Sequence, residues 1–338
     1  MPAKSSPPTC GCCDGVSRRQ FVRTAASAAA LLPFGSVIEA ADRPASKPPT
    51  KTSETLVTQL YQSLTEAQRK EICFGFDDPL RSKIDNNWHI VKPTVAGYFT
   101  PDQQALIRDI FHGLHSPEYA AQVMRQVEHD NGKAGFGGCS VALFGQPGTG
   151  KFEFVLTGRH VTRRCDGDSV EGAAFGGPIF YGHQAGTHFD EAPDHPGNIY
   201  WYQAKRANEL FQALDGKQRK LALLDQARPE RKSDTVKLTG KTSGLAGLPA
   251  SELTRDQKTL LRQVMADVLA PFRKTDADEA MKLVEKGGFD HLHVSFYKGH
   301  DVGGDGVWDV WQVEGPAMLW YFRGDPHVHT WVHVRESA

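Results

Sequence analysis

The feature that most restricts the fold of this chain is a succession of strand-like segments with no helix between them. The segments are rich in Val, Phe and Trp, alternate in polarity and are separated by glycine-rich turns, which is typical of β-strands. Strands that follow one another directly pair antiparallel, because a parallel pair needs a long crossover. We predict such strands in two zones: residues 139–144 and 152–161, then residues 289–297, 307–313, 317–322 and 327–335.

Helices are predicted outside these zones by a signature that occurs four times. A Thr or Asp precedes a Gln by three residues, as in a capping box, at Thr65, Thr100, Asp215 and Thr254. The spacings 65 to 100 and 215 to 254 are similar, 35 and 39 residues, so a duplicated helical unit is one hypothesis. The predicted helices cover residues 53–73, 101–114, 117–130, 200–214, 216–225, 255–270 and 275–286, and residues 226–250 are predicted to form a long loop.

The length allows two domains or one large one, and the succession of strands without helices between them indicates the α+β class. Of the 338 residues, 39% are hydrophobic and 23% are charged, an ordinary globular profile that can bury a core without disulfide bonds. We therefore predict a single α+β domain over residues 53–338, an antiparallel sheet with helices packed around it. The 39 Lys and Arg nearly balance the 40 Asp and Glu, so no strong field favours nucleic acid or an anionic membrane as a partner.

The first fifty residues indicate a targeting segment rather than part of the fold. The pair Arg18-Arg19 precedes a short Ala-rich run at 24–35, a pattern that resembles a twin-arginine export signal. No run of 18 apolar residues occurs, so we expect no membrane span in the mature protein. Cleavage near Ala40 would give a signal over 1–41, followed by a disordered linker over 42–52 that is rich in Pro, Ser and Lys.

The predicted signal has consequences for location, charge and cofactor. It makes the twin-arginine translocase a partner during export and places the protein in the periplasm or otherwise outside the cytoplasm. Its removal takes away four basic and two acidic residues, which leaves 35 against 38 and a net charge of −3. Proteins on this route cross the membrane folded, which suits a protein that acquires a metal beforehand. Of the six cysteines, Cys73, Cys139 and Cys165 remain, so at most one disulfide forms, and a Cys139–Cys165 pair stays open.

A phosphate-loop string at Gly145–Lys151 is rejected as a nucleotide site. The residue after Lys151 is Phe152, where magnesium binding needs a Ser or Thr hydroxyl. A phosphate loop also precedes a helix, whereas Phe152 begins an alternating, strand-like segment. Pro147-Gly148 between two strands predicts a hairpin turn instead, and no nucleotide cofactor is expected.

The histidines point to a metal. Two HxH pairs occur, His291/His293 and His327/His329, and residues i and i+2 of a strand share one face. Two imidazoles side by side suit Zn, Cu or Fe. We predict His327 and His329, with His160 from the end of the predicted strand 152–161, as the ligands of a transition metal. A three-His site leaves an open position for water or substrate.

Two further histidines are expected to border a ligand site. His333 shares the face of His329 further along the strand, and His293 belongs to the other HxH pair. The alternative for every one of these histidines is a structural role, because His residues on a sheet also stack and satisfy hydrogen bonds of the core.

Five segments together resemble the DUF3500 family. They are Tyr98–Gln103 (YFTPDQ), the hairpin 141–156, 158–161 (GRHV), 178–182 (PIFYG) and 327–329 (HVH). The resemblance covers roughly residues 55–335. The family's name marks it as functionally uncharacterised, so the resemblance implies no activity.

The resemblance does single out residues. Members of the family tend to show a GHH-like motif after the hairpin and an HxH near the C-terminus. These motifs match His160 and the pair His327/His329, which implies one shared site. Arg159 stands where the family tends to have the first His. An arginine does not ligate a metal, but it can hold an anionic ligand in a bidentate grip, so we include Arg159 among the ligand-binding residues.

Three functions are compatible with these observations. The first is an exported metalloprotein, with or without enzymatic activity, in which the metal acts as a Lewis acid on an unknown small molecule. The second is a metal-free protein that binds a small carboxylate or sugar in a pocket lined by aromatic side chains. The third is a structural protein of the cell envelope.

Overall fold

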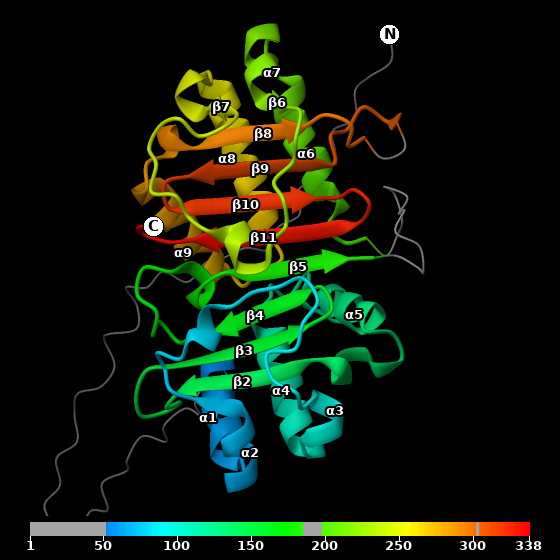
Figure 1. Cartoon of the computed structure of the whole chain (residues 1–338), viewed down its shortest axis with the longest axis vertical. Helices are drawn as coiled ribbons and strands as arrows, with labels where there is room; N and C mark the ends of the chain where they lie inside the picture. The colour runs from blue at the N-terminus through cyan, green and yellow to red at the C-terminus, as the bar shows by residue number, and fades with distance from the viewer. Residues whose placement is uncertain (1–51, 185–197, 302–303) are drawn as a thin grey trace, which may run out of the picture. The chain divides into compact units, whose positions relative to one another are not determined.

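One mostly antiparallel sheet runs through the part of the chain that the computed structural model describes, residues 52–184, 198–301 and 304–338 (Figure 1). Its eleven strands follow the order β1-β2-β3-β4-β5-β11-β10-β9-β8-β6, and β7 pairs with β8. Within the described ranges, only the short outer pairs β1–β2 and β6–β8 are parallel. The strands are β1 Cys73–Phe74, β2 Ser140–Gly145, β3 Phe152–Gly158, β4 Val161–Cys165, β5 Ile179–His183, β6 Leu223–Leu224, β7 Leu248–Pro249, β8 His293–Tyr297, β9 Val310–Gly315, β10 Met318–Arg323 and β11 Val328–Val334.

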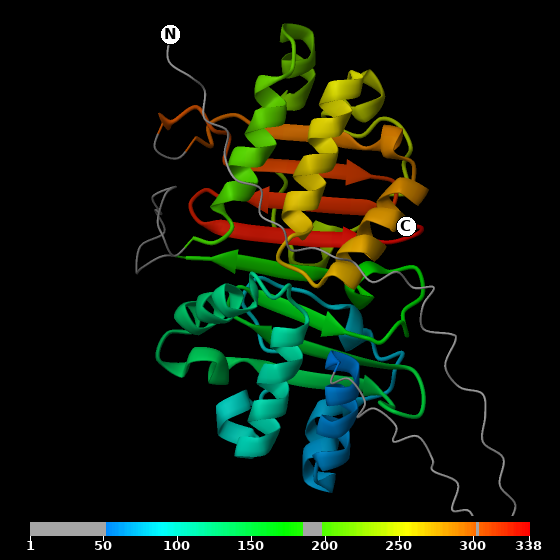
Figure 2. The same cartoon turned by 180° about the vertical axis from the view of Figure 1, so that it is seen from behind.

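Helices cover one face of the sheet (Figure 2). Their apolar residues recur at helical spacing, as in Leu261, Val264, Met265 and Val268 of α8, and pack against buried side chains of the strands. The helices are α1 Ser53–Ser63, α2 Glu66–Ile72, α3 Val95–Tyr98, α4 Pro101–Gly113, α5 Ala120–Asp130, α6 Trp201–Gln212, α7 Gly216–Ala222, α8 Arg255–Leu269 and α9 Lys274–Lys286. The predicted α+β class is therefore confirmed.

Two long connections cross the opposite face, one between β1 and α3 and one between β6 and β7 (Figure 1). They meet where the amide of Ile84 donates to the hydroxyl of Ser233 (3.1 Å). Ile84 and Val236 pack there against Phe180 and Trp331 of the sheet. Both faces of the central strands are thus buried. Among the described residues, no helix is both long and apolar enough to cross a membrane.

The two halves of the sheet repeat one arrangement. Each begins with two helices and a two-residue strand, adds further helices, and ends in four antiparallel strands. The hairpins β3–β4 and β9–β10 have the same register, Gly158 opposite Val161 and Gly315 opposite Met318. When the equivalence is extended through the pairs β4–β5 and β10–β11, Ile179 of β5 corresponds to Val332 of β11. These two residues face each other where β5 and β11 pair, so a local two-fold axis relates the halves.

The four predicted capping boxes form and join in pairs. Gln68 and Gln103 exchange two side-chain hydrogen bonds, of 2.9 and 3.1 Å. Gln218 and Gln257 do the same in the second half, at 2.9 and 2.8 Å. Each glutamine also accepts from the backbone amide of its own cap residue, so these buried amides are satisfied.

Several predicted boundaries were wrong. The helix predicted over 53–73 is two helices and a strand, because Leu64 adopts an extended conformation and Thr65 caps a new helix. The strand predicted over 152–161 ends at Gly158, because residues 159 and 160 turn the chain into β4. Strand β5 was not predicted, because it is short and lies between Pro178 and a glycine-rich region.

The helix predicted over 216–225 ends at Ala222 and residues 223–224 form β6, whereas the remaining predicted strands and helices differ mainly at their ends. Residues 289–291 form a 3₁₀ turn before β8, and residues 307–309 precede β9. The helix predicted from residue 117 begins at Ala120, and the loop predicted over 226–250 contains a 3₁₀ turn and β7. Residues 145–151 join antiparallel strands β2 and β3, as predicted for a hairpin.

Three other predictions concern the cysteines and the N-terminus. Cys73, Cys139 and Cys165 are free thiols, so Cys139 and Cys165 do not pair. The predicted signal over 1–41 lies outside the described residues, as does the predicted linker apart from Thr52, which caps α1. Both stay predictions.

The paired glutamines give the first prediction. Replacing Gln103 by Ala leaves the buried amide of Gln68 without its partner, and replacing Gln257 by Ala does the same to Gln218. Each change should lower the free energy of unfolding by about 2 kcal/mol, because an orphaned buried amide loses its hydrogen bonds. Urea unfolding followed by circular dichroism measures both. Losses below about 0.5 kcal/mol in both variants would show that the pairs do not stabilise the halves.

Candidate metal centre

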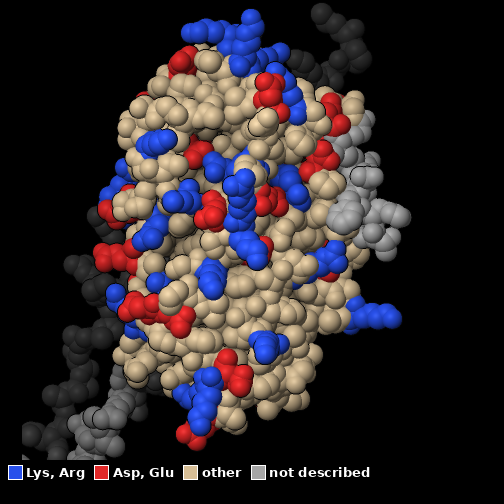
Figure 3. Space-filling model, in the orientation of Figure 1, with Lys and Arg blue, Asp and Glu red and all other residues tan. Residues whose placement is uncertain are grey.

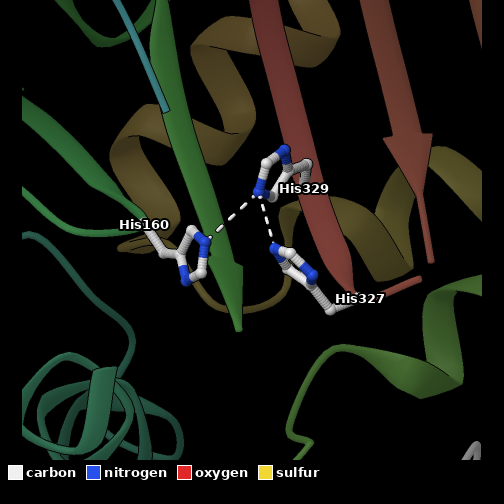
Figure 4. Close-up of side chains that lie close together, drawn as sticks. All are labelled: His160, His327 and His329. Atoms are coloured by element: carbon white, nitrogen blue, oxygen red, sulfur yellow. Dashed lines mark hydrogen bonds between the residues drawn. The ribbon is translucent and has the colours of Figure 1, made fainter. Parts of the chain in front are cut away.

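Three imidazoles converge on one point between β11 and the turn that precedes β4 (Figure 4). The Nε2 atom of His329 lies 2.9 Å from Nε2 of His327 and 3.2 Å from Nε2 of His160. All three side chains are buried, with 4 to 6% of each residue exposed. The residues predicted from sequence as metal ligands are therefore brought together from positions 169 residues apart.

The backbone places each imidazole. His329 lies on β11 opposite Gly182 of β5, and His327 directly precedes β11. His160 occupies the two-residue turn between β3 and β4 with φ of 57°, and its carbonyl oxygen accepts from the amide of Gly182 (3.1 Å). The prediction that His160 lies on a strand was wrong. Its left-handed conformation in a tight turn is what brings its ring beside β5.

Gly182 makes this approach possible. A Cβ atom at this position would collide with the carbonyl oxygen of Val328 and would lie 3.5 Å from the Cβ of His160. A larger residue would force β5 and β11 apart and move His329 away from His160.

Two carboxylates, the buried Asp130 and the half-buried Glu230, hold the rings from behind. Nδ1 of His160 donates to Oδ2 of Asp130 (2.9 Å), at the end of α5. Nδ1 of His329 donates to Oε2 of Glu230 (2.7 Å), whose other oxygen forms an ion pair with Arg323 (3.2 Å). These contacts assign the ring proton to Nδ1 and leave the Nε2 lone pairs of both histidines pointing inward.

Burial keeps His327 and His329 neutral. It lowers the pKa of His327 to about 2, with added repulsion from His329 and His160. Burial also holds the pKa of His329 well below its usual value, and the charge of Arg323 acts in the same direction. Neutral imidazole is the form that ligates a metal. Burial raises the pKa of Glu230, although Arg323 opposes this shift.

The spacing of the nitrogens suits a bound cation. Two inward lone pairs at 3.2 Å repel each other unless a proton or a metal ion lies between them. Ligands at the usual Zn–N distance of ~2.0–2.1 Å in tetrahedral geometry are about 3.3 Å apart, close to the two separations measured from His329, and the ring nitrogens of all three histidines lie within 4.8 Å of one another. The three residues present therefore fit a transition metal with one further position open.

Arg159, the other residue predicted to bind ligand, borders a cavity of about 840 Å³ beside the cluster. Its guanidinium donates to the side-chain oxygen of Gln184, and its charge contributes to the lowered pKa of His329. Asp130 lines the same cavity and binds His160. Asp130 thus borders both the cavity and the three-His cluster.

The two remaining predicted residues lie elsewhere. His293 begins β8, three strands from β11, and its Nδ1 donates to the carbonyl of His291 (3.1 Å). His333 lies at the far end of β11 and donates from Nδ1 to the carbonyl of Val236 (2.9 Å). Neither contacts the three-His cluster. Strand β11 carries His329 and His333 on one face, but three residues of extended chain separate them.

Sequence reasoning missed Asp130, Glu230 and Gly182. Asp130 ends a predicted helix, and Glu230 lies in a region predicted to be loop, so neither had a neighbour in sequence that would mark it. Gly182 was noted only as part of the PIFYG segment. Its role depends on the pairing of β5 with β11, which no local pattern reports.

His333 gives a prediction for pH dependence. Burial lowers the pKa of His333 from 6.5 to about 4, against the opposing effect of its bond to Val236. Between these values the unfolded chain binds the proton and the folded protein does not, so stability is full above pH 6.5 and falls as the pH drops toward 4. His333→Asn keeps a donor but cannot titrate. Over this pH range the free energy of unfolding of the variant should therefore fall by about 1–3 kcal/mol less than that of the wild type.

Urea unfolding at pH 7 and at pH 4.5, in buffer without phosphate, measures this difference. Parallel loss of stability in the wild type and the variant would contradict the assignment.

The comparisons with known proteins give a family and no function. The family model described as "Protein of unknown function (DUF3500)" matches residues 46–337. No curated protein and no solved structure is similar enough to this chain to count as a match. The match covers nearly all of the described residues, including His160, His327 and His329. The chain therefore belongs to the DUF3500 family.

Proposed function

We propose that this protein binds a transition metal through the Nε2 atoms of His160, His327 and His329. The observation that carries the proposal is the convergence of three buried imidazoles, two of which are held from behind by carboxylates. Carboxylates that accept from Nδ1 orient metal-binding histidines and raise their basicity. A structural histidine cluster has no need to point its lone pairs at one another.

The donor set favours borderline ions. Imidazole suits Zn²⁺, Cu²⁺ and Fe²⁺, whereas Ca²⁺ and Mg²⁺ prefer oxygen ligands. Three protein ligands leave a position for water or substrate, and a metal bound there supplies a Lewis acid. Asp130 and Glu230 would fix the rings, and burial would exclude bulk water from the site.

An anionic small molecule is the substrate or ligand that the surroundings favour. Arg159 borders a cavity large enough for a metabolite and presents a guanidinium beside the cluster. If no metal binds, the same cavity supports the second candidate, a metal-free protein that binds a small carboxylate. Both candidates predict that Arg159→Gln loses ligand binding. They differ for a metal-free preparation of the wild type, which should lose ligand binding under the first candidate and keep it under the second.

Export completes the proposal. The Arg18-Arg19 pair before a short apolar run supports passage through the twin-arginine translocase, and with it a periplasmic or otherwise exported location. Lysine at both arginine positions should retain the full-length precursor in the cytoplasm, as fractionation would show. Normal export of that variant would exclude this route.

Removing two ligands tests the metal directly. The His327→Ala/His329→Ala variant should lose at least nine-tenths of the bound metal, because one imidazole cannot hold the ion. Elemental analysis of protein purified without a histidine tag measures this content. His293→Ala is the matched control, because this buried histidine lies on the same sheet outside the cluster. Equal metal content in the double variant and the control would overturn the proposal.

Removing a supporting carboxylate tests the arrangement behind the ligands. Asp130→Asn and Glu230→Gln keep side-chain volume but accept more weakly from Nδ1. Each should reduce metal affinity by about 10- to 100-fold, as competition with a chromophoric chelator would show. Asp278→Asn, at an exposed position of α9, serves as the control. Affinities unchanged in both variants would mean that these carboxylates do not support a metal.

A further inference from the structure

A second cavity, with basic walls, lies at the other end of β5 and β11. It measures about 320 Å³ and is separate from the three-His cluster. Four of its lining side chains are basic and one, Asp234, is acidic. It opens on the face crossed by the two long connections, where Figure 3 shows Lys and Arg side chains gathered over the middle of the molecule. The basic side chains are Arg81, Arg164, Lys237 and Arg335.

Arg164 is the fixed base of the cavity. Its side chain is 1% exposed and donates to Glu153 (2.6 Å) and to the carbonyls of Pro178, Arg81 and Lys83. These bonds use four of the five N–H groups of the guanidinium, and the fifth, on Nη2, has no acceptor among the described residues. A rigid, buried cation with a spare donor is suited to an anionic ligand.

Arg81 adds a second guanidinium. Its Nη1 donates to Glu153 (2.8 Å) and its Nε donates to the carbonyl of Phe76 (2.7 Å). Its Nη2 has no acceptor among the described residues. Glu153 is completely buried and binds both arginines, so it fixes their position and cancels only one of their two charges.

Lys237 and Arg335 complete the rim. Both are exposed, and neither side chain has an ion-pair partner in the described part of the chain. His333 also lines the cavity, and because its Nδ1 donates to Val236, its Nε2 remains as an acceptor. The four cations against Asp234 and Glu153 leave an excess of two positive charges.

We propose that this cavity binds the phosphate group of a small metabolite. A phosphate dianion matches the excess charge, and paired guanidiniums suit its oxygens. The volume exceeds that of phosphate alone, which leaves room for a small organic part. A hydroxyl on that part, or on a singly protonated phosphate, can donate to Nε2 of His333. The site is independent of the metal and does not depend on the function proposed above.

Titration calorimetry of the full chain with inorganic phosphate tests the proposal. The probe could also bind at a metal, so the titration is repeated with His327→Ala/His329→Ala, which should bind phosphate as the wild type does. Lys237→Gln/Arg335→Gln changes only exposed side chains of the cavity rim and should weaken the affinity at least tenfold. The control Lys220→Gln/Lys241→Gln removes the same charge at exposed positions outside the cavity.

The outcomes separate the alternatives. Specific weakening in the rim variant, with the control unchanged, supports the site. Absence of phosphate binding to the wild type overturns it. Equal weakening in the rim variant and the control also overturns it, because binding would then depend only on the net charge of the protein. Loss of binding in the histidine variant alone would assign the phosphate to the metal instead and also overturn the proposal.

Discussion

The pairing of β5 with β11 is the interaction on which the rest of the structure depends. Five residue pairs, from Val328 opposite His183 to Val332 opposite Ile179, join two half-sheets into one. This contact joins the last strand of each half and pairs two edges whose backbone groups would otherwise meet water. It also places Gly182 between His160 and His329, which is why the three imidazoles can meet. A shift by one residue would turn His329 to the opposite face.

The two-fold relation between the halves makes their differences informative. The hairpin that carries Arg159 and His160 corresponds to the one at Pro316 and Ala317, and counting along the strands relates His329 to Gly176. The position that the two-fold axis relates to the three-His cluster therefore has the same framework without the imidazoles. At that end Gly176 instead borders the basic cavity around Arg164. One framework thus carries two chemically different sites, neutral nitrogen donors at one end and guanidiniums at the other.

The sequence was sufficient where the signal was local. The capping boxes at Thr65, Thr100, Asp215 and Thr254 identified four helix starts, because a cap and its glutamine lie three residues apart. The HxH of β11 identified two of the three clustered histidines for the same reason.

The sequence was insufficient where the signal depended on pairing between distant strands. Strand β5 was missed, His160 was placed on a strand instead of in a turn, and His333 was expected closer to the metal. Asp130 and Glu230 were not found, because their role depends on which distant ring each carboxylate faces.

Anomalous diffraction from crystals of the metal-loaded protein, collected at the absorption edge of the bound metal, tests the central claim most directly. The account predicts one strong peak about 2 Å from Nε2 of each of His160, His327 and His329, the usual metal–imidazole distance. A peak at any other position, or well-ordered histidines with no peak in protein that holds no metal after incubation with Zn²⁺, Cu²⁺ and Fe²⁺, would contradict it.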